Sequence, residues 1–165
     1  MKRLIRCILL FLVAAALLLP LVSCGDKETE PDPTELPEKT FTLYGLTLTL
    51  TEGFSEANEQ ELTVLRADTI AVFVDRVDFE TMAGAAELPL LTYARHFSEQ
   101  ARESDGLVLL EYTASGSGGN GYGYFTAFYK SEGAFYTLQL ACRAELYEAY
   151  RPSFVKWAKS AVPTF

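Results

Sequence analysis

The chain has 165 residues, of which 22 are acidic and 14 basic, so its net charge is −8, and 49% of its residues are apolar. An acidic chain repels nucleic-acid phosphates and anionic lipid headgroups, which argues against nucleic-acid binding and against electrostatic adhesion to membranes. The length suits one ordinary domain, and nine tyrosines and eleven phenylalanines favour a sheet-rich core.

The first 23 residues are predicted to be a secretory signal peptide. Three basic residues precede an apolar run from Ile8 to Leu19, the order typical of such peptides. The run is shorter than the roughly 18 residues of a spanning helix, which favours cleavage over a retained membrane anchor.

The end of this segment, Leu21-Val22-Ser23-Cys24, resembles the lipobox of bacterial lipoproteins. The resemblance implies that Cys24 is lipidated and becomes the mature N-terminus. It further implies an anchor in a bacterial membrane, on the non-cytoplasmic side of the cell envelope.

Residues 24–40 are predicted to be the lipidated cysteine and a tether. This stretch is acidic and rich in proline, and it has too little apolar surface to offset the entropy lost on ordering. Without residues 1–23 the chain keeps 11 basic and 22 acidic residues, a net charge of −11. The remainder, 41–165, is predicted to be a single domain.

Alternating residues predict the first strands of this domain. Leu46, Leu48 and Leu50 alternate with threonines, the period of a half-buried strand. Gly45 is predicted to be a bend or bulge between this strand and a short strand at 41–44. Further strands are predicted at 62–66 and 69–79.

A helix is predicted between Pro89 and Gly106, with Pro89 at the first helical position and Gly106 as the C-cap. Its apolar stripe has the spacing i, i+3, i+4, i+7 and i+11. The residues of the stripe are Leu90, Tyr93, Ala94, Phe97 and Ala101.

Three strands, at 107–113, 122–130 and 134–143, are predicted to follow, the last two joined by a short loop at 131–133 that contains glycine. A terminal helix is predicted at 150–162, with Pro152 early in it. The order of elements predicts an α+β fold, with an antiparallel sheet of about six strands and two helices packed on it.

Two stretches resemble the PsbP/Mog1-like family. The first is Leu43-x-Gly45-Leu46-x-Leu48-x-Leu50-x-x-Gly53-Phe54; the second combines Phe135-Tyr136-x-Leu138 with Tyr150-x-Pro152-x-Phe154-x-x-Trp157. Thr51-Glu52 departs from the proline that many members have there. The resemblance implies the fold of that family, whose members, bacterial lipoproteins among them, mostly serve in binding and assembly.

The glycine-rich segment 116–123 allows two interpretations. A phosphate cradle requires a helix N-terminus and usually a nearby lysine, whereas this segment lies between two predicted strands and contains Asn120-Gly121, a hairpin signal. We therefore expect a hairpin tip that contacts a partner. The expected contact residues are Gly118, Gly119, Asn120, Gly121, Tyr122 and Tyr124.

The tyrosines of the last hairpin are expected on both faces of the sheet. Tyr122 and Tyr124 share strand parity with Phe128, whereas Tyr129 shares it with Phe125. Most of these rings are expected to be buried in the core of the sheet. Any rings that remain exposed would form an amphipathic contact patch.

Residues with reactive side chains have structural interpretations as well as catalytic ones. Once Cys7 is removed and Cys24 lipidated, Cys142 is alone, and its strand parity with Leu138 and Leu140 predicts a core position. A Cys142–His96 hydrolase dyad stays open.

Asp75, Asp78 and Glu80 are predicted to form a solvated acidic edge, since they lack the spacing of a calcium loop. No catalytic residue, metal or cofactor is predicted.

The sequence thus predicts a membrane-anchored envelope lipoprotein whose domain binds or assembles and is not an enzyme. Its predicted partners are the membrane, through the lipid on Cys24, and a protein of the envelope. The alternative is a small-ligand-binding or sensor domain that uses a tyrosine-rich cleft between the sheet and a helix.

Overall fold

The computed structural model describes residues 32–59, 62–67, 69–115 and 121–164. The predicted signal peptide, Cys24 and the predicted contact residues Gly118, Gly119 and Asn120 lie outside the described residues.

The described residues form two antiparallel sheets. The larger has seven strands in the order β3 (Ser55–Glu59), β4 (Leu62–Ala67), β5 (Ile70–Asp78), β9 (Ala134–Arg143), β8 (Gly121–Lys130), β7 (Leu107–Ser115) and β6 (Arg102–Ser104). The smaller has three, in the order β1 (Glu38–Leu43), β2 (Leu46–Thr51) and β10 (Val162–Pro163).

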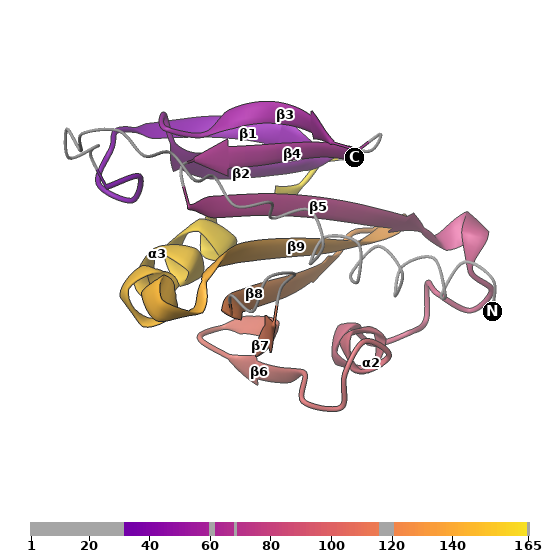
Figure 1. The fold of residues 1–165 in the computed structure, drawn as a ribbon. Coiled ribbons are helices and arrows are strands. Elements are labelled where there is room, and N and C mark those ends of the chain that lie inside the picture. The colour runs from indigo at the N-terminus through magenta and orange to yellow at the C-terminus, as the bar shows by residue number, and fades with distance from the viewer. Residues whose placement is uncertain (1–31, 60–61, 68, 116–120, 165) are drawn as a thin grey trace.

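Two α-helices pack on opposite faces of the seven-stranded sheet (Figure 1). Helix α3 (Tyr147–Ser160) and the smaller sheet share one face, and the short helix α2 (Leu90–Arg95) covers part of the other. Single 3-10 turns, η1 (Phe79–Thr81) and η2 (Ala144–Leu146), follow β5 and β9. The predicted α+β class is confirmed, but the strands divide into two sheets.

The main core lies between the two sheets and α3. Leu46, Leu48 and Leu50 of β2 point into it and are fully buried, as their alternation with threonine predicts. Trp157 of α3 is 2% exposed and meets the Phe54 ring edge-on at 5.3 Å. Apolar burial of this kind is the main force that holds the layers together.

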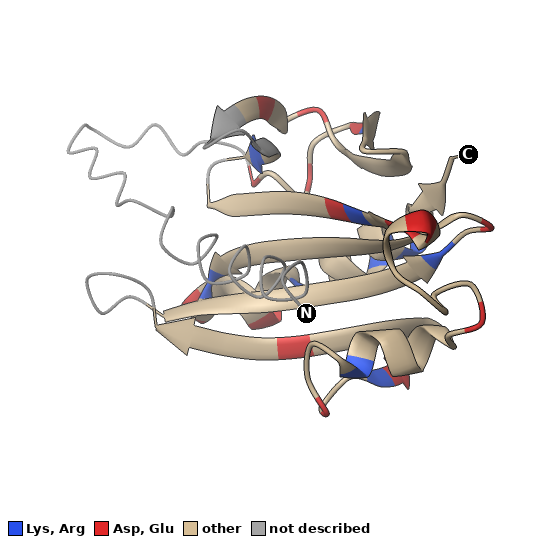
Figure 2. Ribbon diagram, turned by 90° about the vertical axis from the view of Figure 1, so that its right-hand side faces the viewer, with Lys and Arg blue, Asp and Glu red and all other residues tan. Residues whose placement is uncertain are grey.

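The second core cluster joins α2 to the opposite face of the sheet. Tyr93 of α2 stacks on Phe135 of β9 with ring centroids 4.0 Å apart, and it meets Phe128 of β8 edge-on. Strands β8 and β9 therefore have apolar cover on both faces. Charged residues occur only at their ends, as Figure 2 shows.

Two glycines have roles that differ from the predicted ones. Gly45 is not a bulge: with Tyr44 it forms a two-residue hairpin turn between β1 and β2, and both residues have positive φ. Gly106 is not a helix cap: with Asp105 it forms the same kind of turn between β6 and β7. Paired positive φ angles are the requirement of type I′ hairpins, which favour Asp-Gly.

The prediction of a helix that continues to Gly106 is wrong, since α2 ends at Arg95. The next residues turn back, and Arg102–Ser104 form β6 against β7. The predicted apolar stripe nevertheless lies in one cluster, because burial of these side chains does not require helix throughout. Helix α3 begins three residues earlier than predicted, so Pro152 lies inside it.

The chain before β1 packs on the domain from residue 32 onward. The Thr51 hydroxyl donates to the Pro33 carbonyl, the Glu52 N–H donates to the Pro37 carbonyl, and Leu36 contacts Gly53. Strand β1 begins at Glu38. Part of the stretch predicted as tether is thus ordered against β2, through its few apolar residues.

No helix among the described residues is long and apolar enough to cross a bilayer.

Candidate functional site

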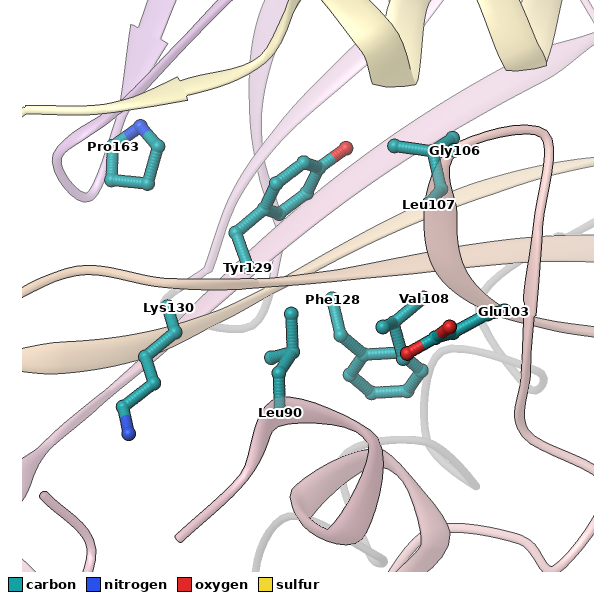
Figure 3. Close-up of a pocket in the computed structure, with 9 residues that line it drawn as sticks. All are labelled: Leu90, Glu103, Gly106, Leu107, Val108, Phe128, Tyr129, Lys130 and Pro163. Carbon is teal, nitrogen blue, oxygen red and sulfur yellow. The ribbon is translucent and has the colours of Figure 1, made fainter. Parts of the chain in front are cut away.

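A pocket of about 460 Å³ lies where β10, β7–β8 and the start of α2 meet. Its volume falls in the range of small-molecule sites, roughly 300–1,000 Å³. The residues that line it are Leu90, Glu103, Gly106, Leu107, Val108, Phe128, Tyr129, Lys130 and Pro163 (Figure 3).

The pocket has apolar walls and opposite charges at its two ends. Figure 3 shows Lys130 and Glu103 far apart, with Leu90 and Phe128 between them. The wall residues come from both faces of β8, since Phe128 belongs to the α2 cluster and Tyr129 packs against the main core. A ligand with an apolar body and polar ends matches this arrangement.

Lys130 is held in place by the main chain. Its Nζ donates to the carbonyl oxygens of Ala86, at 2.7 Å, and Leu88, at 2.9 Å, and lies 5.5 Å from the Phe79 and Phe135 ring centroids. An ammonium group has three donors, and two of them are taken by these carbonyl oxygens. Glu103 is exposed and makes no ion pair with the described part of the chain.

Tyr129 has a structural role in the pocket wall. Its hydroxyl donates to the Ala158 carbonyl of α3 at 2.7 Å, and burial raises the pKa of this phenol. The neutral hydroxyl therefore stays a donor at physiological pH and ties β8 to α3.

A charge network beside the pocket joins α3 to the edge of the sheet. Glu111 of β7 accepts hydrogen bonds from the Tyr147 hydroxyl at 2.8 Å and from Arg151 Nε at 2.6 Å, and it also pairs with Arg102 of β6. Arg151 bonds Asp105 as well, at 3.2 Å. The network holds β6, β7 and α3 together at this corner.

The network shifts the pKa of its members. Burial by itself would raise the pKa of Glu111, but hydrogen bonds from Arg151 and Tyr147 and the positive charges of Arg151 and Arg102 outweigh it, so the pKa is lowered. Burial, with the bond to Glu111, raises the pKa of Tyr147. These groups are thus held in fixed protonation states, as a structural clamp requires.

Cys142 and His96 lie on opposite sides of the seven-stranded sheet. Cys142 is 1% exposed in the main core, and burial raises the pKa of its thiol to about 12. His96 follows α2 on the other face, exposed, with Nδ1 donating to the Thr92 carbonyl at 2.8 Å. The sheet separates the two side chains, so the dyad hypothesis is wrong, and the predicted core position of Cys142 is confirmed.

The acidic residues near the end of β5 do not converge. Asp78 pairs with Arg76 at 2.7 Å, and Glu80 is exposed in η1. Within the described ranges, no group of three or more His, Cys, Asp or Glu side chains is placed to hold a metal ion.

The described members of the predicted contact surface lie at the start of β8. Gly121 is exposed, whereas Tyr122 is 7% and Tyr124 2% exposed, in a cluster with Ala141. The predicted division of faces is confirmed: Tyr122 and Tyr124 lie on the side of Phe128, and Tyr129 lies on the side of Phe125.

The pocket itself was not predicted from the sequence. Glu103 and Gly106 were assigned to the end of a helix, and Lys130 to the end of a strand. The Asp105-Gly106 pair was an available signal, because this dipeptide favours a hairpin turn, and that turn places Glu103 beside β7.

No protein-family model and no curated protein matches the chain. Among solved structures, it is similar to the solution structure of cyanobacterial PsbP from Synechocystis sp. PCC 6803, with 13% identity and a TM-score of 0.48, over 88% of this chain and 99% of that one. It is also similar to a crystal structure from Bacteroides thetaiotaomicron VPI-5482, with 8% identity and a TM-score of 0.54, over 73% of this chain.

These similarities concern the fold. The chain spans only 46% of the length of the Bacteroides protein, and at 8% identity a shared fold does not transfer a function. The PsbP structure bears the name of the family that the sequence resembles, but its TM-score supports no argument about function.

Proposed function

We propose that this protein is a lipid-anchored component of a bacterial cell envelope, whose α+β domain binds another molecule and does not catalyse a reaction. The anchor is proposed from the signal peptide and from Leu21-Val22-Ser23-Cys24. The observation that carries the binding role is the 460 Å³ pocket, whose fixed ammonium and free carboxylate stand at the ends of apolar walls.

The chemistry of the reactive residues supports binding over catalysis. A nucleophile needs a base within hydrogen-bond reach, and the Cys142 thiol lies in the main core while His96 lies beyond the sheet. Lys130 is engaged by two carbonyl oxygens, which suits a group that positions a ligand.

The binding role is tested by reversing one charge in the pocket. Glu103→Lys changes an exposed pocket residue, and Glu99→Lys makes the same change at an exposed position outside the pocket. Native membranes from cells that express each variant are crosslinked, and the captured partner is quantified by mass spectrometry. We expect Glu103→Lys to lower its recovery at least about fivefold, roughly 1 kcal/mol, and Glu99→Lys to leave it unchanged. Equal recovery with both variants would reject the pocket as the binding site.

The anchor is tested separately by palmitate labelling. Cys24→Ala should abolish incorporation and leave the precursor unprocessed, whereas Cys142→Ala should incorporate palmitate like the unaltered chain. Continued labelling of Cys24→Ala would reject the lipid assignment and leave the pocket experiment unaffected.

A second candidate function is small-ligand binding or sensing at the sheet face that α2 covers in part. Stacked tyrosines and buried polar side chains on this face favour it.

A further inference from the structure

The outer edge of β7 from Leu110 to Ser115 has no strand partner among the described residues. Strand β6, which ends the seven-stranded sheet on this side, pairs only with Leu107–Leu109 (Figure 1). The rest of β7 pairs with β8 on its inner side, and no other described segment makes a main-chain hydrogen bond to it. The described part of the chain thus leaves the outer N–H and C=O groups of this stretch open to another strand.

The other outer strands of the two sheets have features that discourage pairing with a further strand. Strand β1 begins with the exposed charged residues Glu38 and Lys39, and β3 has an exposed charge at Glu56. Strand β10 has two residues, one of which is Pro163. Charge, proline and short length are the usual ways in which a protein protects an edge strand.

The open stretch of β7 lacks these protections. Its register with β8 is unbroken, so it contains no bulge, and its only charged residue is Glu111. That carboxylate lies on the α3 face, where it pairs with Arg102 and Arg151. A regular edge with a neutralised charge is suited to pairing with another strand.

We infer that this edge pairs with the same edge of a second copy of the chain. In an antiparallel pair centred on Thr113, the two copies of Thr113 face each other, Tyr112 faces Ala114, and Glu111 faces Ser115. Facing threonines stabilise a strand pair, the Tyr112 ring covers the small Ala114, and the Ser115 hydroxyl donates to the Glu111 carboxylate. No like charges meet, so the edge is complementary to itself.

The position of β6 decides the centre of this pairing. Leu110 is 5% exposed and packs in one cluster with Ala101, which directly precedes β6. A pair centred on Tyr112 would bring the second copy against Leu110, where the chain enters β6. A pair centred on Thr113 uses only Glu111–Ser115 and leaves β6 in place.

The symmetry of this pair is compatible with two chains anchored in one membrane. The facing copies of Thr113 lie on a two-fold axis perpendicular to the sheet, so the α3 faces of both copies lie on the same side. The smaller sheet lies on this face, and the chain from residue 32 onward packs on its strand β2 through Thr51. Both N-terminal segments are therefore on one side of the joined sheet.

The size of the contact indicates where the dimer forms. A ladder over Glu111–Ser115 is smaller than the roughly 1,000 Å² that a stable interface needs. We therefore expect pairing where the chain is concentrated, as on a membrane that holds many copies. This expectation about location rests on the proposed anchor, whereas the pairing itself does not.

The test compares Thr113→Cys with Ser115→Cys in the full-length chain. Both positions are exposed, and they lie on the same face of β7. Facing Cα atoms of antiparallel strands are about 4.5–5.5 Å apart, within disulfide range, whereas the two copies of Ser115 would be about 13 Å apart. Cells that express each variant are oxidised with copper phenanthroline, and disulfide-linked dimers are measured on non-reducing gels.

We expect Thr113→Cys to give at least about ten times the dimer of Ser115→Cys, after subtraction of the yield from the unaltered chain. Cys142 does not contribute, because it is 1% exposed in the main core. Urea midpoints equal to that of the unaltered chain would show that both variants fold.

The oxidation is repeated on the purified full-length chain in detergent at about 1 mM, where pairing does not depend on an anchor. A dimer of Thr113→Cys there and not in cells supports the pairing and counts against the anchor. The inference is overturned if the two variants give equal yields in both settings, or if Thr113→Cys gives no dimer in either. It is also overturned if Thr113→Cys crosslinks only to a different protein, which would assign this edge to that partner.

Discussion

Replacing Glu111 with glutamine should remove the negative charge that joins α3 to the edge of the seven-stranded sheet. Glu111 receives hydrogen bonds from Tyr147, Arg151 and Arg102, and its side chain is only 14% exposed. Glutamine keeps one acceptor oxygen and loses the charge, so the arginines face a weaker partner.

The expected cost follows from these contacts. A hydrogen bond to a charged group contributes about 1.5–3 kcal/mol, but the arginine side chains of Arg102 and Arg151 are 49% and 31% exposed, so solvent weakens the attraction. We expect Glu111→Gln to lower the free energy of unfolding by about 2 kcal/mol at pH 7, or the Tm by roughly 4–8 °C.

Urea unfolding measures this loss directly, because Trp157 is the only tryptophan of the chain and is buried, so its fluorescence reports on the core. The control is Glu148→Gln, which changes an exposed carboxylate of α3 that lies outside the network. It should change stability by less than about 0.5 kcal/mol.

The pH dependence provides a second test of the same contact. The pKa of Glu111 is lowered in the folded protein from a usual value of 4.5, so the carboxylate contributes its stability above that value and loses it as pH falls through the folded pKa. The difference between Glu111→Gln and the unaltered chain should therefore shrink below pH 4.5. A difference that is absent at pH 7, or equally large at pH 3, would refute this account.

Three further predictions concern the main core. Trp157→Ala should cost about 3–5 kcal/mol, measured by circular dichroism in urea, and a loss below about 1 kcal/mol would contradict the packing of this ring on Phe54. Gly123→Ala should lower the free energy of unfolding by about 1–3 kcal/mol, because an added Cβ would lie 2.5 Å from the Tyr147 ring. Gly133→Ala is the control and should leave the free energy of unfolding nearly unchanged, because a Cβ added there has no atom within 4 Å. Iodoacetamide at pH 8 should leave Cys142 unmodified in the folded chain and alkylate it in urea, because burial raises the pKa of its thiol to about 12. Modification is measured by mass spectrometry of the cysteine peptides. Rapid modification of the folded protein would contradict the burial of Cys142.

Local patterns were sufficient to predict much of the secondary structure. The strand predicted at 134–143 and the hairpin loop at 131–133 match the structure, because adjacent strands need only a short connection and the right turn residues. The inward position of Cys142 followed from strand parity alone, since side chains alternate strictly along a strand.

The same reasoning was wrong where two structures could bury the same side chains. The apolar stripe that ends at Ala101 is compatible with a long helix and also with a short helix followed by a turn. The structure has the short helix, because Arg102–Ser104 pair with β7 as a strand. Gly45 was predicted to be a bend or bulge and Gly106 a helix cap, whereas each is the second residue of a two-residue hairpin turn after Tyr44 or Asp105. Of the two pairs, only Asp105-Gly106 has the residue types that such a turn favours.

By itself, the sequence determined the α+β class, the parity of the central strands and the expectation of a lipid on Cys24, since each depends on residues close together in the chain. Only the tertiary structure decided that Cys142 and His96 are separated by the sheet and that the pocket joins α2, β6, β8 and β10. The reason is physical: pairing between distant segments is set by the total burial of all layers together, and no local pattern contains that sum.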